Sequence, residues 1–174
     1  MNTVELLLHP VRLRIVQTLL GDQVLTTAEL SEKLGVTPAS LYRHINLLAS
    51  AGMLEVAGER PIRGTVERSY RLNIAATRIT PDELAAMTAE DHHQAFIAYI
   101  AGAIADFDKY LSTGDIDLVR DGIGYTTAGL WLDDQEFVEF AKELARVFGK
   151  RIGNQPGDGR KLRTVRVINL PGGQ

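Results

Sequence analysis

The sequence contains no cysteine among its 174 residues. Disulfide bonds and thiolate metal ligands are therefore excluded, which fits a reducing cytoplasm. Long hydrophobic runs are also missing: no segment approaches the roughly 20 apolar residues that span a bilayer, and none has the pattern of a secretory signal peptide. We expect a soluble cytoplasmic protein with no membrane partner.

Acidic residues outnumber basic ones in the whole chain, and the excess lies in the second half. Residues 1–75 carry eight Lys and Arg against seven Asp and Glu, whereas residues 76–174 carry eleven against fifteen. Every basic residue between positions 36 and 72 is an arginine, the side chain best suited to phosphate and guanine. The first half can therefore bind nucleic acid, and we expect two domains, residues 1–75 and 76–174.

Helical patterns fill most of the first fifty residues. Apolar residues recur at helical spacing over residues 4–20, and the regular helix begins either there or at Pro10, with an arm or a separate turn before it. Thr26 and Glu29 have the spacing of a capping box and predict the start of a second helix, which Gly35 ends.

A third helix is predicted to begin at Pro38, with Thr37 as its N-cap. Leu41, Ile45 and Leu48 form its buried stripe. The remaining positions point away from the core and make a face able to contact DNA: Ala39, Ser40, Tyr42, Arg43 and Asn46.

A β-hairpin is expected after the third helix. Residues 53–56 and 66–72 have strand character, and the tip at residues 59–64 is too polar and too interrupted for a strand. The tip offers Arg60 and Arg63 to a minor groove or to the DNA backbone. Three helices followed by such a hairpin define a winged helix-turn-helix.

The segment TAELSEKLGVTPASLYRHINLLASAGMLEVAGERPIRGTVERSYRL resembles the winged helix-turn-helix of ArsR-type bacterial regulators. The resemblance covers about residues 8–73, and its most specific parts are AELSEKLGV, LYRHINLL, AGML and RSYRL. It implies DNA contacts at Thr37, Pro38, Ala39, Ser40, Tyr42, Arg43, Arg60 and Arg63. Our candidate set also contains Asn46 and Arg68, together with His44, which bonds either a backbone carbonyl or a phosphate.

Two departures from that family bear on function. The third helix has no cysteine pair, so the thiolate metal-sensing site of the founding members is absent. About a hundred residues follow the wing, where many members have a single helix.

The second half is expected to begin with a long helix over residues 81–112, which a capping box at Thr80 and Glu83 starts. Its apolar residues alternate spacings of three and four, as in a heptad seam that joins two subunits: Ile97, Ile100, Ile104, Phe107 and Leu111. A strand over residues 125–132, a helix that Asp133 caps and a strand over residues 162–170 then predict a small α/β layer. The fold class is α+β.

All five phenylalanines and the single tryptophan lie beyond residue 90. They form either the core of a homodimer or an effector pocket lined by Tyr99, Phe107, Tyr125 and Trp131. Both interpretations stay open.

Motifs for catalysis and cofactor binding are missing from the sequence. There is no nucleophile elbow, phosphate loop or paired-carboxylate signature, so we expect neither an enzyme nor a cofactor. Asp91, His92 and His93 are adjacent on a helix and point in different directions, which predicts no metal site. The expected function is sequence-specific binding of double-stranded DNA by a homodimeric transcription regulator. The alternatives are a winged-helix protein-interaction module and a protein that binds a small-molecule effector.

Overall fold

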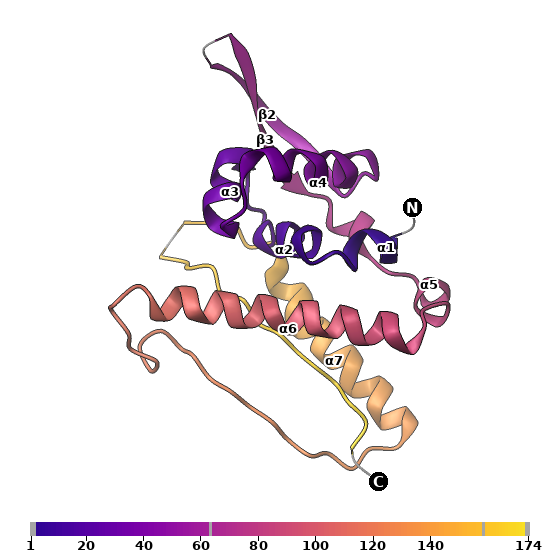
Figure 1. Ribbon diagram of the computed structural model, residues 1–174. Coiled ribbons are helices and arrows are strands. Elements are labelled where there is room, and N and C mark those ends of the chain that lie inside the picture. Colours follow the sequence, from indigo (N-terminus) through magenta and orange to yellow (C-terminus); the bar gives the residue numbers. More distant parts are fainter. Residues whose placement is uncertain (1–2, 63, 158, 173–174) are drawn as a thin grey trace. The chain divides into compact units, whose positions relative to one another are not determined.

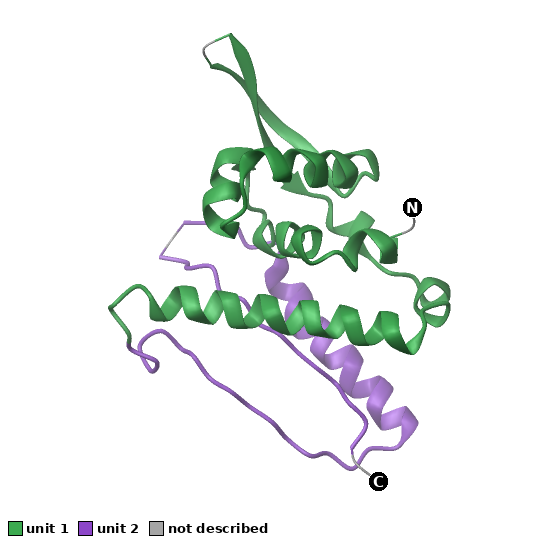
Figure 2. Ribbon diagram, in the orientation of Figure 1, with its two compact units in different colours: residues 1–116 green, residues 117–174 purple. Residues whose placement is uncertain are grey.

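The computed structural model describes residues 3–62, 64–157 and 159–172. Its elements are, in chain order, α1 (Thr3–Leu7), α2 (Pro10–Thr18), β1 (Leu25–Thr26), α3 (Thr27–Leu34), α4 (Pro38–Ser50), β2 (Leu54–Ile62), β3 (Thr65–Leu72), the 3-10 helix η1 (Ile74–Thr77), α5 (Pro81–Ala85), α6 (Ala89–Leu111) and α7 (Asp134–Ile152) (Figure 1). The chain divides into two compact units, residues 1–116 and 117–174 (Figure 2). The α+β class is confirmed; a domain boundary at residue 75 stays a prediction.

Helices α2, α3 and α4 pack against one another and enclose the core of unit 1. The predicted stripe of α4 is confirmed, because Leu41, Ile45 and Leu48 are all fully buried. The sheet adds Leu54 and Tyr70 to the same cluster of buried residues. The hydrophobic core therefore fixes which face of α4 remains available to a partner.

The first expected helix is divided at Pro10. His9 is the N-cap of α2, and its Nδ1 accepts a hydrogen bond from the backbone N–H of Val11 at 3.2 Å. Proline fits the first helical position because its missing N–H needs no partner there. Of the two starting points considered for the regular helix, Pro10 is correct, and the residues before it form α1.

Helix α3 begins and ends where the sequence predicts. The hydroxyl of Thr26 accepts from the backbone N–H of Glu29, and the Glu29 carboxylate accepts from the N–H of Thr26. Gly35 follows with φ 64°, a left-handed conformation that costs glycine little. Thr37 is the N-cap residue of α4 as expected, although within the described part of the chain its side chain makes no capping hydrogen bond.

The strands form one antiparallel sheet in the order β1-β3-β2. Strands β2 and β3 extend as a hairpin away from the helices, as a wing does (Figure 1). They run further than expected, since Pro61 pairs with Val66 and Ile62 with Thr65. A proline is tolerated because β2 is an edge strand. The expectation that residues 59–62 interrupt the strand is therefore wrong.

The helix expected over residues 81–112 consists of two helices, α5 and α6. The first capping box, at Thr80 and Glu83, is confirmed. A second capping box joins Thr88 to Asp91 and starts a new helix at Ala89. Threonine at the N-cap has extended backbone angles, so the chain cannot continue helically through it. The prediction of a single unbroken helix is therefore wrong.

Unit 2 contains one regular element among its described residues. Helix α7 starts at the predicted Asp133, which forms a capping box with Glu136. Residues 125–132 and 162–170 form no strands, so the expected α/β layer is wrong. Alternating sequence favours extended backbone, but a strand also needs a neighbouring strand to pair with, and among the described residues neither segment is paired in a ladder.

None of the helices described here is both long and apolar enough to cross a membrane.

Candidate nucleic-acid interface

The exposed face of α4 carries most of the predicted contact residues. Tyr42 is 53% exposed, and the other exposed positions are Thr37, Pro38, Ala39, Ser40, Arg43 and Asn46. They occupy the N-cap and the first three turns of the helix, opposite the buried stripe. A helix presented in this way can enter a major groove with its N-terminal residues at the base edges.

His44 is the exception among the predicted contacts, because it lies inside the protein. It is 3% exposed, and its ring centroid is 4.5 Å from that of His9 at the start of α2. Its Nδ1 has no hydrogen-bond partner among the described residues. Burial lowers the pKa of His44, and the positive charges of His9, Arg12 and Arg43 lower it further. His44 therefore does not belong to the exposed face.

Arg12 is buried next to this histidine pair. Its guanidinium donates from Nε to the carbonyl of Leu6 at 2.5 Å and from Nη2 to the carbonyl of Glu5 at 2.7 Å. These bonds join α2 to the last turn of α1. Burial lowers the pKa of Arg12, and Arg43 adds to the effect. Arg12 thus adds a positive charge behind α4 to that of Arg43 on its surface.

The arginines of the wing are exposed but paired with glutamates. Arg60 lies 2.9 Å from Glu67, Arg68 lies 2.8 Å from Glu59, and Arg71 lies 3.0 Å from Glu55. Arg63, which was also predicted to contact DNA, lies outside the described residues. Arg60 and Arg68 were predicted as contact residues, but their glutamate partners were not, because the pairs form only in the register of β2 against β3.

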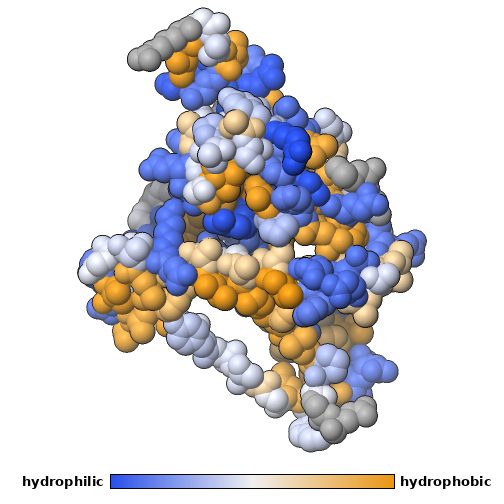
Figure 3. Space-filling view, viewed as in Figure 1, coloured by the Kyte–Doolittle hydropathy of each residue, from blue (hydrophilic) through white to orange (hydrophobic). Residues whose placement is uncertain are grey.

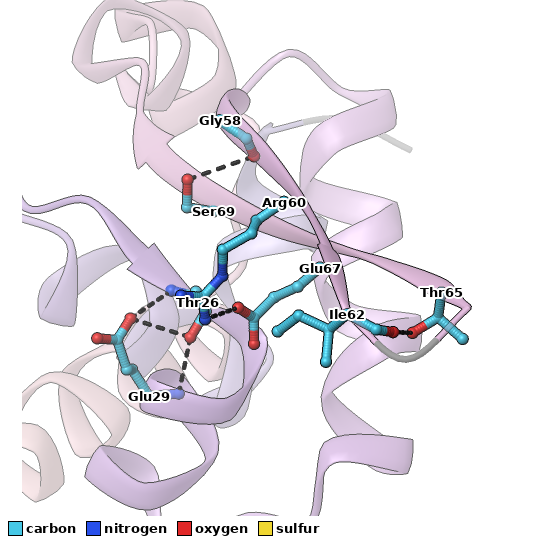
Figure 4. A network of polar contacts seen from close by, with 8 residues as sticks. All are labelled: Thr26, Glu29, Gly58, Arg60, Ile62, Thr65, Glu67 and Ser69. Atoms are coloured by element: carbon cyan, nitrogen blue, oxygen red, sulfur yellow. Dashed lines mark hydrogen bonds and ion pairs between the residues drawn. The ribbon is translucent and has the colours of Figure 1, made fainter.

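Arg60 also faces the start of α3. Figure 4 shows its side chain reaching from the hairpin toward Glu67 and the capping box of Thr26 and Glu29. The hydrogen bonds from Thr26 lower the pKa of Glu29, and the charge of Arg60 makes a smaller contribution in the same direction. The positive charge of Arg60 on the hairpin therefore acts on the carboxylate that caps α3.

Tyr70 connects the wing to α4. It is 5% exposed, and burial raises its pKa, with a smaller contribution from the phenol of Tyr42. Its hydroxyl also interacts with Arg68. Tyr42 thus lies near the base of the wing, so both elements contribute to one surface.

The predicted dimer residues lie along α6, where apolar side chains reach the surface (Figure 3). Ile97, Ile104 and Leu111 are exposed, whereas Ile100 and Phe107 are half-buried. On its other side, α6 approaches α2 so closely that a Cβ on Gly102 would lie 2.4 Å from Oε1 of Gln17. Helix α6 therefore packs on α2 along one face and leaves another face apolar and exposed.

The residues proposed for an effector pocket belong to different units. Tyr99 and Phe107 lie on α6 of unit 1, and Phe107 stacks on Tyr110 with ring centroids 6.3 Å apart. Tyr125 and Trp131 lie in unit 2, where both are exposed. An effector pocket built from these residues stays a prediction.

A cavity of about 460 Å³ lies between α1, α5 and the first turn of α6. Its lining includes four carboxylates, those of Glu5, Asp82, Glu83 and Asp91. Glu83 accepts from the N–H groups of Thr80 and Thr3, and Asp91 accepts from that of Thr88. These bonds lower the pKa of both Glu83 and Asp91, so two of the four acids already serve to fix helix ends. No group of three or more His, Cys, Asp or Glu among the described residues is arranged to hold a metal ion.

Comparison with known proteins finds a match for residues 7–57 of the chain. A family model described as a helix-turn-helix domain matches residues 7–57, which extend from the end of α1 through α4 into β2. A search of curated proteins finds no significant match. The protein therefore contains a helix-turn-helix DNA-binding domain, which points to regulation of transcription. The hairpin that follows makes this domain a winged helix-turn-helix.

Proposed function

We propose that the protein is a cytoplasmic transcription regulator that binds a specific DNA sequence as a homodimer. In this proposal α4 enters the major groove, the wing lies along the backbone or minor groove, and α6 joins two subunits. The observation that carries the proposal is the division of α4 into a fully buried stripe and a continuous exposed face that includes Tyr42, Arg43 and Asn46. This is the geometry of a recognition helix.

The roles on DNA follow from side-chain chemistry. Arg43 can donate two hydrogen bonds to the O6 and N7 atoms of guanine, and Asn46 can bond adenine in the same bidentate way. We assign Thr37 and Ser40, at the N-terminus of α4, to phosphate contacts, because helix N-termini attract phosphates. Two recognition helices in a dimer would read half-sites about 34–36 Å apart on a palindromic operator.

Selection of bound genomic fragments, followed by anisotropy titrations on the selected duplex, tests DNA binding. Arg43→Ala should weaken binding to the selected duplex by about 1–3 kcal/mol if Arg43 contacts a guanine. Arg78→Ala removes an exposed arginine outside α4 and the wing and serves as the control. Equal losses on selected and random duplexes would make Arg43 a phosphate contact, and no binding to any DNA at low salt would refute the proposal.

Dimerisation is tested separately by light scattering of the purified protein. Ile104→Glu places a charge on the exposed apolar face of α6 and should shift the protein toward the monomer. Gln94→Glu adds the same charge at an exposed polar position of the same helix and should leave the dimer intact. A monomeric wild-type protein at micromolar concentration would contradict the dimer.

A further inference from the structure

We propose that Glu55, Glu59 and Glu67 compete with DNA phosphates for the arginines of the wing and so hold down its affinity for DNA of any sequence. The inference rests on the proposed function, because it concerns the same surface. It assigns a role to three carboxylates that are not among the predicted DNA-contact residues.

The three ion pairs follow the strand register. Glu55 faces Arg71, Glu59 faces Arg68, and Arg60 faces Glu67 across the β2–β3 ladder. Side chains directly opposite one another in an antiparallel pair are in contact range. The pairs are therefore a property of the folded hairpin and re-form whenever it folds.

The pairs lie on both faces of the hairpin. Arg68 is two residues before the buried Tyr70 and shares its face of β3, whereas Glu67 and Arg71 lie on the opposite face. Each face of the wing thus has at least one arginine and at least one glutamate. Whichever face approaches DNA, a carboxylate accompanies the guanidinium.

The charges of β2 and β3 cancel, which determines how the ion pairs affect binding to DNA phosphates. Strands β2 and β3 contain three arginines and three glutamates, so their net charge is zero. A DNA phosphate that pairs with one of these arginines must displace the glutamate carboxylate, or it remains close to that carboxylate and is repelled by it. Two unit charges about 4 Å apart in water interact by an energy equivalent to roughly a fivefold change in affinity.

The ion pairs are exposed to solvent, so a phosphate can replace a glutamate as the partner of an arginine. The arginine side chains of the three pairs are between 53% and 73% exposed, and exposed ion pairs add little to stability. The glutamates can therefore be replaced at little cost to the fold, while each remaining carboxylate still repels the DNA backbone. Base contacts by α4 then contribute a larger share of the binding free energy. The preference for a specific sequence therefore rises relative to the affinity for DNA of any sequence.

The test compares the wild-type protein with the triple variant Glu55→Gln/Glu59→Gln/Glu67→Gln as full-length chains. The control, Glu90→Gln/Glu139→Gln/Glu143→Gln, changes the net charge equally at exposed positions outside the hairpin. Anisotropy titrations use a random-sequence duplex and a selected genomic duplex over a series of NaCl concentrations. Circular dichroism verifies that all three proteins are folded.

The hairpin variant should bind random duplex about tenfold tighter than the control variant at low salt. Its plot of log affinity against log salt should be steeper by about one for each arginine that gains a phosphate, and its preference for the selected duplex should shrink. Equal or weaker binding than the control would overturn the inference, with weaker binding showing that the glutamates position the arginines. Absence of duplex binding by all three proteins would instead refute the proposed function.

Discussion

Replacing His44 by leucine should stabilise the protein, although the residue lies in α4, the proposed recognition helix. The buried Nδ1 of His44 has no hydrogen-bond partner among the described residues, and an unsatisfied buried polar atom costs about 1–3 kcal/mol. Leucine has a similar size and removes the polar atom. Part of the gain is offset by the lost contact with the ring of His9, so we expect a net increase of about 1 kcal/mol in the free energy of unfolding at neutral pH.

The same substitution should reduce the loss of stability in acid. Burial and the charges of His9, Arg12 and Arg43 hold the pKa of His44 below its ordinary value, and burial, Arg12 and Arg43 do the same for His9. Below about pH 6.5 the unfolded state therefore binds more protons than the folded state. The contribution of these two histidines to the free energy of unfolding is fully present above that pH. It is lost as the pH drops through 6.5 toward their lowered pKa values.

Urea unfolding at about pH 7.5 and pH 5.5, followed by circular dichroism, measures both effects. The wild-type protein should lose more stability between these two pH values than the His44→Leu variant does. His93→Leu replaces an exposed histidine on α6 and should leave the wild-type loss unchanged. A His44→Leu variant that is less stable than the wild type at neutral pH and keeps the full loss in acid would refute the destabilising role of the buried Nδ1.

Four further substitutions, at three positions, test the packing and capping of unit 1 by urea unfolding. Leu41→Ala should cost about 2–5 kcal/mol because Leu41 is fully buried; a cost under 1 kcal/mol would contradict its place in the core. Thr26→Ala should cost about 0.5–2 kcal/mol through loss of the cap of α3, and unchanged stability would count against that cap. Gly102→Leu should cost about 1–3 kcal/mol by overpacking against Gln17. Gly102→Ala should cost less, since the end of the Gln17 side chain can move; equal costs would argue against the close contact.

Signals that act within one turn of the chain could be predicted from the sequence. The capping boxes at Thr26, Thr80 and Asp133 start helices where expected, because each joins residues three positions apart. The buried stripe of α4 was predictable for the same reason, since helical periodicity fixes which residues share a face. The capping box of Thr88 and Asp91 has the same spacing, so the break between α5 and α6 was predictable from the sequence as well.

Features that depend on pairing between distant residues could not be predicted. The glutamate partners of the wing arginines follow from the register of β2 against β3, including the shift between Val56 and Gly58. The burial of His44 follows from the docking of α4 against the start of α2. Neither feature produces a periodic pattern in the sequence, because each depends on which distant parts of the chain come together in the fold.

The distribution of buried residues bears on how such a protein could be regulated. Among the described residues, every buried hydrophobic side chain lies between Val4 and Ala98 in unit 1. Unit 2 leaves Trp131 fully exposed, and α7 has no buried residue. The helix-turn-helix is thus stabilised by its own core, so association of the second unit with a partner subunit or an effector can change without unfolding the DNA-binding surface. If the proposed homodimer forms, covering the apolar side chains of α6 and unit 2 supplies free energy for assembly, and any ligand that alters this burial would alter how two copies of α4 are held for DNA.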